Sequence, residues 1–185
     1  PVGLTRKHKR RESNIQSAFL KTDSHIHALE VQLPSQRTIK IKIEVDINPP
    51  LGFQTEEKLL LQPFSFYVKT YRQPDLFAGK MHALLFRKWR NRVKGRDFYD
   101  FEWYVRRGTP INLSHFLDRA HQSGDLLELS TLSLGDLNEL LHQKMHVVDF
   151  DLARRDVEPF LKDTRSLDVW SSQYFSELTE RLIAC

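Results

Sequence analysis

Two acidic residues stand two positions apart in a segment whose aliphatic and polar residues alternate strictly. Aliphatic side chains occupy the odd positions of the segment from Ile39 to Ile47, and Glu44 and Asp46 occupy even positions. Successive side chains of a strand point to opposite faces, so both carboxylates lie on one face, roughly 7 Å apart at their Cα atoms. Hard cations prefer carboxylate oxygens. The spacing therefore suits a Mg²⁺ site, and the alternative is a strand with a polar outer face that binds nothing.

A basic stretch further along the chain has the residue types that bind phosphate. Seven Lys and Arg residues and no acid occur between Lys80 and Arg96. Lys80 and Arg87 share one face of a predicted helix from Leu76 to about Trp89, with Asp75 as its expected N-cap. Two cations on one helix face can hold two phosphate oxygens. The alternative is a solvated basic face.

Two aspartates follow in a second predicted helix, which opens at Arg96 or Asp97 and ends near Arg106. Asp97 and Asp100 are three residues apart, so they share a helix face. Asp100 lies among aromatic residues, where a carboxylate needs a partner. Because a short basic loop joins the two helices, we expect Lys80 to lie within hydrogen-bonding reach of Asp97 or Asp100. Such pairs are equally typical of structural salt bridges.

Other familiar sites are not indicated. His142 and His146 are four residues apart but are not in H-E-x-x-H order, and the single cysteine, Cys185, cannot form an intrachain disulfide. The sequence has no Walker A loop, GxGxxG or G-x-S-x-G motif. Asp149 and Asp151 form a D-x-D pair that is better explained as a helix cap.

The elements that must position these residues indicate an α+β fold, with a small mixed or antiparallel sheet followed by a helical C-terminal half. Strands are predicted over 14–21, 25–33, 39–47 and 65–70, and further helices over 113–122, 133–146, 151–161 and 171–183. The alternation predicts that Ile39, Ile41, Ile43, Val45 and Ile47 are buried, whereas Glu44 and Asp46 face a cleft.

Charge is divided unevenly along the chain. Residues 1–108 have 21 Lys and Arg against 11 Asp and Glu, whereas residues 109–185 have 7 against 13. This shift predicts a boundary between an α/β portion, 1–108, and a helical subdomain, 109–185. A basic surface attracts polyanions. No apolar run approaches the roughly 18 residues that span a bilayer, so we expect a cytoplasmic protein that does not enter a membrane.

The same residues carry a resemblance to a known family. The stretch IKIEVDINPP, followed by AGKMHALLFR and GRDFYDF, resembles the AbiEii/AbiGii nucleotidyltransferase toxins, which are similar to the polymerase β-type nucleotidyltransferase superfamily. The resemblance spans roughly residues 13–178. It implies a nucleotidyltransferase of a toxin–antitoxin and phage-defence system that moves a nucleoside monophosphate from an NTP to an acceptor, expected to be RNA. A cognate antitoxin protein is the implied partner.

The resemblance also implies roles for single residues. Glu44, Lys80, Asp97 and Asp100 match catalytic positions, and Lys80, Arg87 and Arg96 match positions that contact nucleotide phosphates. Glu44, with Asp46 beside it, matches a Mg²⁺-binding carboxylate.

One departure concerns the first motifs of that superfamily. No Gly-Gly or Gly-Ser pair occurs in the sequence, and no D-x-D pair precedes Glu44. We therefore expect an incomplete or degenerate enzyme that does not transfer nucleotides by itself. Two other functions stay open: a non-catalytic module that binds nucleic acid or a protein partner, and a metal-dependent nuclease that uses Glu44 and Asp46.

Overall fold

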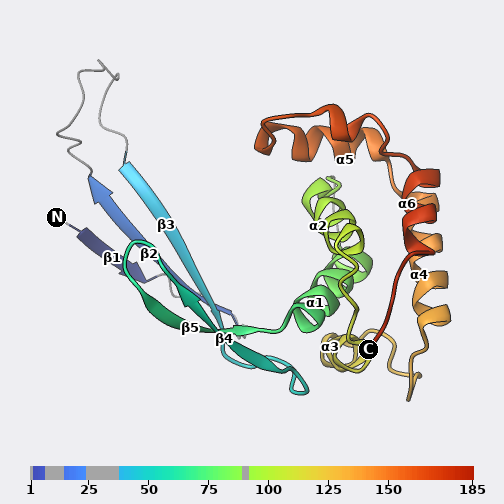
Figure 1. Cartoon of the computed structure of the whole chain (residues 1–185), viewed down its shortest axis with the longest axis horizontal. Coiled ribbons are helices and arrows are strands. Elements are labelled where there is room, and N and C mark those ends of the chain that lie inside the picture. The colour runs from blue at the N-terminus through green and yellow to red at the C-terminus, as the bar shows by residue number, and fades with distance from the viewer. Residues whose placement is uncertain (1, 7–14, 24–37, 89–91) are drawn as a thin grey trace. The chain divides into compact units, whose positions relative to one another are not determined.

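The computed structural model of the chain describes residues 2–6, 15–23, 38–88 and 92–185, and it confirms the α+β class (Figure 1). Strands come first and helices follow. The elements are β1 (Val2–Arg6), β2 (Ile15–Asp23), β3 (Thr38–Asp46), β4 (Thr55–Leu60), β5 (Phe66–Tyr71), α1 (Gln73–Phe86), α2 (Gly95–Arg106), α3 (Leu113–Ser123), α4 (Leu134–Val147), α5 (Phe150–Val157) with the 3₁₀ turn η1 (Glu158–Phe160), the 3₁₀ turn η2 (Arg165–Leu167) and α6 (Ser172–Thr179). The strand predicted over 25–33 lies outside the described residues.

Contacts divide the chain into two compact units, residues 1–49 and 50–185. The first unit contains a three-stranded antiparallel sheet in the order β1-β2-β3. Strand β3 is the segment whose alternation predicted it, and its Glu44 lies opposite Ser17 of β2. Glu44 and Asp46 therefore lie on one face of this sheet.

The predicted burial of the aliphatic face of β3 is wrong where it can be examined. Ile43, Val45 and Ile47 have exposed fractions of 41%, 53% and 56%. Ile39 and Ile41 lie outside the residues whose burial is described. Alternation determines which face a side chain occupies, whereas burial needs a second layer on that face. None of the described residues forms such a layer over these three side chains.

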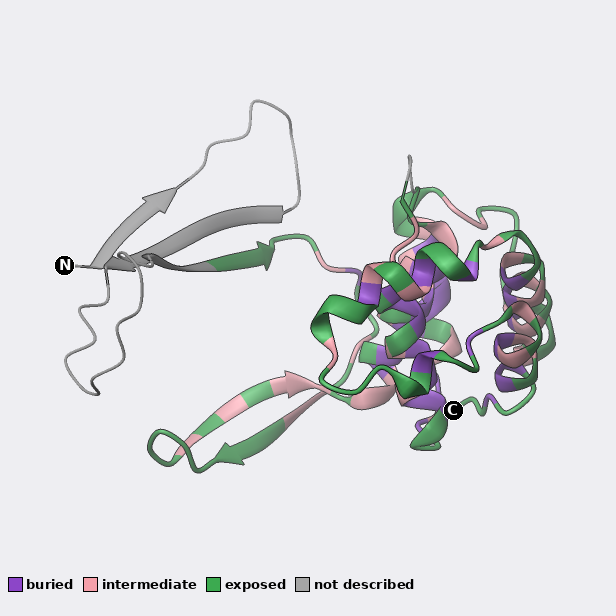
Figure 2. Ribbon diagram, turned by 90° about the horizontal axis from the view of Figure 1, so that it is seen from above, coloured by how far each residue is buried: buried purple, intermediate pink, exposed green. Residues whose placement is uncertain are grey.

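The second unit contains the β4–β5 hairpin and all the helices. Helix α1 packs against α2 and α3, α2 packs against α5, and α4 packs against α6. Buried residues gather in these helices, whereas the hairpin is exposed or half-buried (Figure 2). The apolar stripe predicted on α1 is confirmed, because Phe77, Met81 and Leu84 are fully buried.

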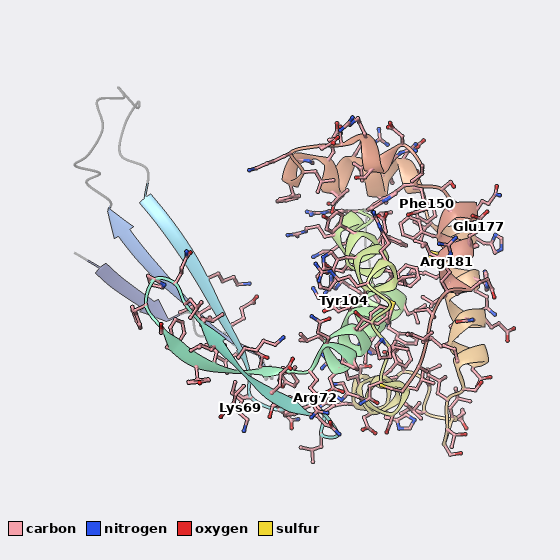
Figure 3. All side chains as sticks on the ribbon, viewed as in Figure 1. Lys69, Arg72, Tyr104, Phe150, Glu177 and Arg181 are labelled. Atoms are coloured by element: carbon pink, nitrogen blue, oxygen red, sulfur yellow. The ribbon has the colours of Figure 1, made fainter. Side chains whose placement is uncertain are left out.

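Aromatic rings connect the helices of this core. Phe98 of α2, Phe150 of α5 and Phe175 of α6 form a cluster with ring centroids 5.0 to 5.4 Å apart. Tyr104 of α2 stacks on Phe77 of α1 at 4.6 Å. Phe150 and Tyr104 are labelled in Figure 3. These contacts determine how α2 is held between α1 on one side and α5 and α6 on the other.

Local sequence signals explain several helix ends. Asn112 caps α3 by accepting a hydrogen bond from the His115 backbone N–H, and Gly124 ends that helix in the left-handed conformation with φ of 83°. Ser133 and Asp136 form a capping box at the start of α4. Helices α3 and α4 consequently begin and end within about one residue of the predicted bounds.

The predicted N-cap of α1 is wrong. The helix begins at Gln73, and its N-cap is Arg72, with Pro74 in the first turn. Asp75 lies inside the first turn, where its carboxylate accepts hydrogen bonds from the Gln54 backbone N–H and from Asn112 Nδ2, both at 2.7 Å. Tertiary partners therefore use the carboxylate that sequence alone would assign to capping.

Two strands were not predicted, and the charge boundary differs from the unit boundary. β1 and β4 lack alternation in sequence and are defined by pairing with β2 and β5.

The charge shift at 108–110 lies within the second unit, where helices on both sides of it contribute to one core through Phe101 and Phe116. Among the described helices, none has the length and apolar character needed to cross a membrane.

Candidate functional site

Helices α1 and α2 bring the predicted charged residues together. Lys80 Nζ of α1 donates a hydrogen bond to Asp100 Oδ2 of α2 at 2.7 Å. The prediction that Lys80 lies within hydrogen-bonding reach of Asp97 or Asp100 is therefore confirmed, with Asp100 as the partner. Both side chains are accessible, with exposed fractions of 47% and 32%. Exposed ion pairs of this kind contribute only about 0–1 kcal/mol to stability, so Lys80 can exchange Asp100 for another anion at little cost.

A second pair joins the same two helices closer to their connection. Arg87 Nη1 donates to both carboxylate oxygens of Asp97, at 3.0 and 2.9 Å. The Asp97 side chain is only 9% exposed. Burial raises the pKa of Asp97 above its usual value, and it outweighs the opposing attraction of Arg87 and Lys94. Arg87 is thus held by a buried acceptor and is much less free than Lys80 to bind a ligand.

The start of α2 is fixed by α5. The backbone N–H of Gly95 donates to Asp156 Oδ2 at 3.1 Å, and Arg92 Nε donates to Asp156 Oδ1 at 2.6 Å. A Cβ atom at Gly95 would lie 1.9 Å from the carbonyl oxygen of Ala153. Only glycine allows this close approach. The glycine that precedes Arg96 and Asp97 is therefore required by the packing of α2 on α5.

The two charged pairs, Lys80–Asp100 and Arg87–Asp97, line an open pocket of about 560 Å³. Its lining is Lys80, Arg87, Lys94, Arg96, Asp97, Tyr99, Asp100, Val157, Phe160 and Leu161. Four cations against two carboxylates give the lining a formal net charge of +2 when all of them are ionised. The volume lies in the range of small-molecule sites, and the charge favours an anionic ligand.

Sequence reasoning missed several residues of this region. Lys94 lies in the basic stretch from Lys80 to Arg96, but it was not predicted as a site residue. Tyr99 lies three residues after Arg96 and so shares its helix face, which is a signal that could have been used. Asp156 and Phe160 come from α5 and η1, more than 60 residues from α2 in the case of Asp156. No local pattern indicates that packing.

The two acids of β3 belong to the first compact unit, and the structure describes them only within it. Glu44 forms an ion pair with Lys42 on the same face of the strand. Asp46 accepts a hydrogen bond from the Asn48 backbone N–H at 3.1 Å. Both side chains are exposed.

These acids do not make a complete metal site by themselves. Mg²⁺ needs near-octahedral oxygen coordination, and a lysine already neutralises Glu44. Across residues 42–88 and 92–185, no three His, Cys, Asp or Glu side chains form a group that could hold a metal ion. The D-x-D at 149–151 has other partners, because Asp149 caps α5 and Asp151 pairs with Arg154. The prediction that this pair serves as a cap is confirmed for Asp149.

Comparison with known protein families identifies a family that matches this chain. The model of the family described as "Nucleotidyl transferase AbiEii toxin, Type IV TA system" matches residues 3–178. No significant match was found among curated proteins or among solved structures. The matched range covers nearly the whole chain, including β3, the pocket and α5. A nucleotidyl transferase family of this kind implies an NTP substrate, usually a divalent metal ion, and a cognate antitoxin.

Proposed function

This chain belongs to the AbiEii nucleotidyl transferase toxin family, and we propose that the pocket between α1, α2 and η1 binds the triphosphate of an NTP. The bound nucleotide would donate its nucleoside monophosphate to an acceptor, which we propose to be RNA. The observation that carries the proposal is the gathering of four cations around one open pocket on the two helices that contain the family-like motif.

Lys80 and Arg96 are the residues proposed to contact phosphate directly. Lys80 has an exposed and therefore weak pair with Asp100, so a phosphate oxygen can replace that carboxylate. Arg96 lines the same pocket and has no carboxylate partner within hydrogen-bonding distance among the described residues. Arg87 is proposed as a positioning residue, because Asp97 holds its guanidinium from a buried site.

Where the metal site is complete, as in a family member with all superfamily motifs, the proposed reaction is a displacement at phosphorus. The hydroxyl oxygen of the acceptor bonds to the α-phosphorus, the bond from that phosphorus to the bridging oxygen of the β-phosphate breaks, and pyrophosphate leaves. Asp100 is the proposed acceptor for the hydroxyl proton, because its carboxylate is accessible and is freed when Lys80 turns to phosphate. Cations at the triphosphate stabilise the charge that develops on the leaving group.

Glu44 and Asp46 are proposed as carboxylates that help to hold Mg²⁺. In phosphoryl transfer such an ion would neutralise negative charge on phosphate oxygens. Two carboxylates, one of them paired with Lys42, do not complete its coordination. We therefore derive no chemical step from the ion, and we propose that the 185-residue chain binds nucleotide without transferring it.

A non-catalytic binding module is the second candidate. It is favoured by the departure from the superfamily motifs, because the sequence has no Gly-Gly or Gly-Ser pair and its D-x-D at 149–151 is occupied by capping and pairing contacts. No structural observation favours the nuclease, since Glu44 is paired with Lys42.

The proposal is tested by isothermal titration calorimetry, in which ATP is titrated into the chain at low and at high salt. Lys80→Ala removes a proposed phosphate contact, so we expect ATP affinity to fall roughly tenfold or more. Lys69→Ala is the matched control, because Lys69 is an exposed lysine of β5 outside the pocket (labelled in Figure 3). Binding by the parent chain should weaken as salt rises. Equal affinities for the two variants would refute the assignment of the pocket.

A further inference from the structure

The pocket has a second wall that is apolar and comes from the last residue of α5, from η1 and from the residue after η1. Val157, Phe160 and Leu161 form this wall, whereas the charged residues of the lining come from α1, α2 and the segment between them. A site that bound only inorganic phosphates would need no such surface. A ligand that fits both walls has one anionic end and one flat apolar end.

Phe160 is the most accessible member of that wall. Its exposed fraction is 62%, although it lies at the edge of a helical core in which other phenylalanines are fully buried. The guanidinium of Arg96 lies over the ring, with Cζ 4.9 Å from the centroid. Because the guanidinium covers one face of the ring, the exposed surface of Phe160 belongs to the rest of the ring. An aromatic surface is therefore open to the pocket.

The contact between Arg96 and Phe160 joins the charged and the apolar wall of the pocket. Arg96 is one of the proposed phosphate-binding residues, and its stacking on Phe160 holds the guanidinium at the border between the charged and the apolar wall. Tyr99, three residues further on the same face of α2, also lines the pocket. The lining thus has two aromatic rings and a planar cation, a combination typical of surfaces on which bases stack.

We infer that Phe160 is the stacking platform for the nucleobase of the bound NTP, while Lys80 and Arg96 hold its phosphates. This inference rests on the proposed function, because it assumes that the ligand is a nucleotide. Every base has a π-face, so stacking discriminates poorly between bases. We therefore expect the pocket to accept several NTPs with similar affinity.

The test compares two probes, ATP and inorganic tripolyphosphate, on the parent chain and on Phe160 variants. Tripolyphosphate has the anionic end of ATP but no base. We expect the parent chain to bind ATP more tightly than tripolyphosphate. Phe160→Ala should weaken ATP binding by about 5- to 150-fold, the range for loss of one base stack. It should change tripolyphosphate binding by less than about threefold.

Two further Phe160 variants separate stacking from mere bulk. Phe160→Trp keeps an aromatic face and should retain ATP affinity, whereas Phe160→Leu keeps apolar volume without a π-face and should behave like Phe160→Ala. The matched control is Phe64→Ala, because Phe64 is a similarly exposed phenylalanine, at 69%, that does not line the pocket. Circular dichroism should show an unchanged fold, since a side chain this exposed contributes little to the core.

The outcomes distinguish this inference from the proposed function. If tripolyphosphate binds the parent chain and Lys80→Ala weakens it, but Phe160→Ala leaves ATP binding unchanged, the inference is wrong and the phosphate site stands. If Phe160→Ala weakens only the binding of a single-stranded RNA, the ring serves the acceptor and the inference is also wrong. If neither ATP nor tripolyphosphate binds the parent chain, both proposals fail.

Discussion

Replacing Gly95 by alanine tests the packing on which the pocket depends. The added Cβ would lie 1.9 Å from the Ala153 carbonyl oxygen, 2.9 Å from its carbonyl carbon and 3.2 Å from Val157 Cβ. Two of these three neighbours are backbone atoms, so no side-chain rotation relieves the clash. Helix α2 must therefore retreat from α5 by roughly 1 Å within a close-packed interior. That movement stretches the hydrogen bond from Gly95 N–H to Asp156.

The magnitude follows from two opposing effects. Overpacking of this kind lowers the free energy of unfolding by about 1–3 kcal/mol and occasionally more. The higher helix propensity of alanine raises it by at most about 1 kcal/mol. The clash prevails, and we expect a loss of about 2 kcal/mol in the free energy of unfolding. For a chain of this size the melting temperature should fall by roughly 4–8 °C. Urea unfolding and a thermal melt measure both quantities.

A matched glycine serves as the control. Gly135 is an exposed residue in the first turn of α4, where an added Cβ would meet only Ser133 Oγ, at 3.6 Å. Gly135→Ala should be neutral or stabilise the chain by up to about 1 kcal/mol. If Gly95→Ala is as stable as Gly135→Ala, the close approach of α2 and α5 is not as described. The argument for Phe160 at the pocket, and for Asp156 as the support of α2, would then fail as well.

Three further predictions concern the site and its support. Arg87→Ala should destabilise the chain by about 2 kcal/mol in urea unfolding, because it leaves the buried Asp97 carboxylate without the Arg87 Nη1 donor that both its oxygens share. Lys80→Ala should cost less than about 1 kcal/mol, and equal losses would contradict the distinction between a buried and an exposed pair. Tyr174 donates a hydrogen bond to the buried Glu102, and burial together with this bond raises the pKa of Tyr174 to about 12 from a usual 10.0. Its contribution to stability is present below pH 10 and is lost as pH rises toward 12, so the stability difference between parent and Tyr174→Phe should shrink over that range; a constant difference would refute it. The 185-residue chain should transfer no labelled nucleotide to bulk RNA with Mg²⁺, under conditions in which a family member with all superfamily motifs does; transfer that Glu44→Ala abolishes would show that other acids complete the metal site.

Sequence could predict the parts of the site that depend on neighbours along the chain. Lys80 and Asp100 meet because a short connection joins their helices, and each lies on the helix face that its spacing predicts. The ends of α3 and α4 were predictable for the same reason, since Asn112, Gly124 and Ser133 act on their own backbone.

The remaining features depend on packing between distant segments. Asp156 of α5 supports the start of α2 from 61 residues away, and Phe160 of the following turn η1 completes the pocket. The error at β3 has a related origin, because the pattern that places Ile43 on one face does not reveal whether another layer covers that face. Asp75 is a further example, because local rules predict that its carboxylate caps α1, whereas it accepts hydrogen bonds from Gln54 and Asn112.

The central claim is that the pocket between α1, α2 and η1 binds the triphosphate of a nucleotide, and a crystal structure with ATP tests it most directly. We predict phosphate oxygens within hydrogen-bonding distance of Lys80 Nζ and the Arg96 guanidinium. The distance from Lys80 Nζ to Asp100 Oδ2 should lengthen from 2.7 Å to beyond hydrogen-bonding range, while Arg87 stays on Asp97. ATP bound elsewhere, with the Lys80–Asp100 pair intact, would contradict the claim.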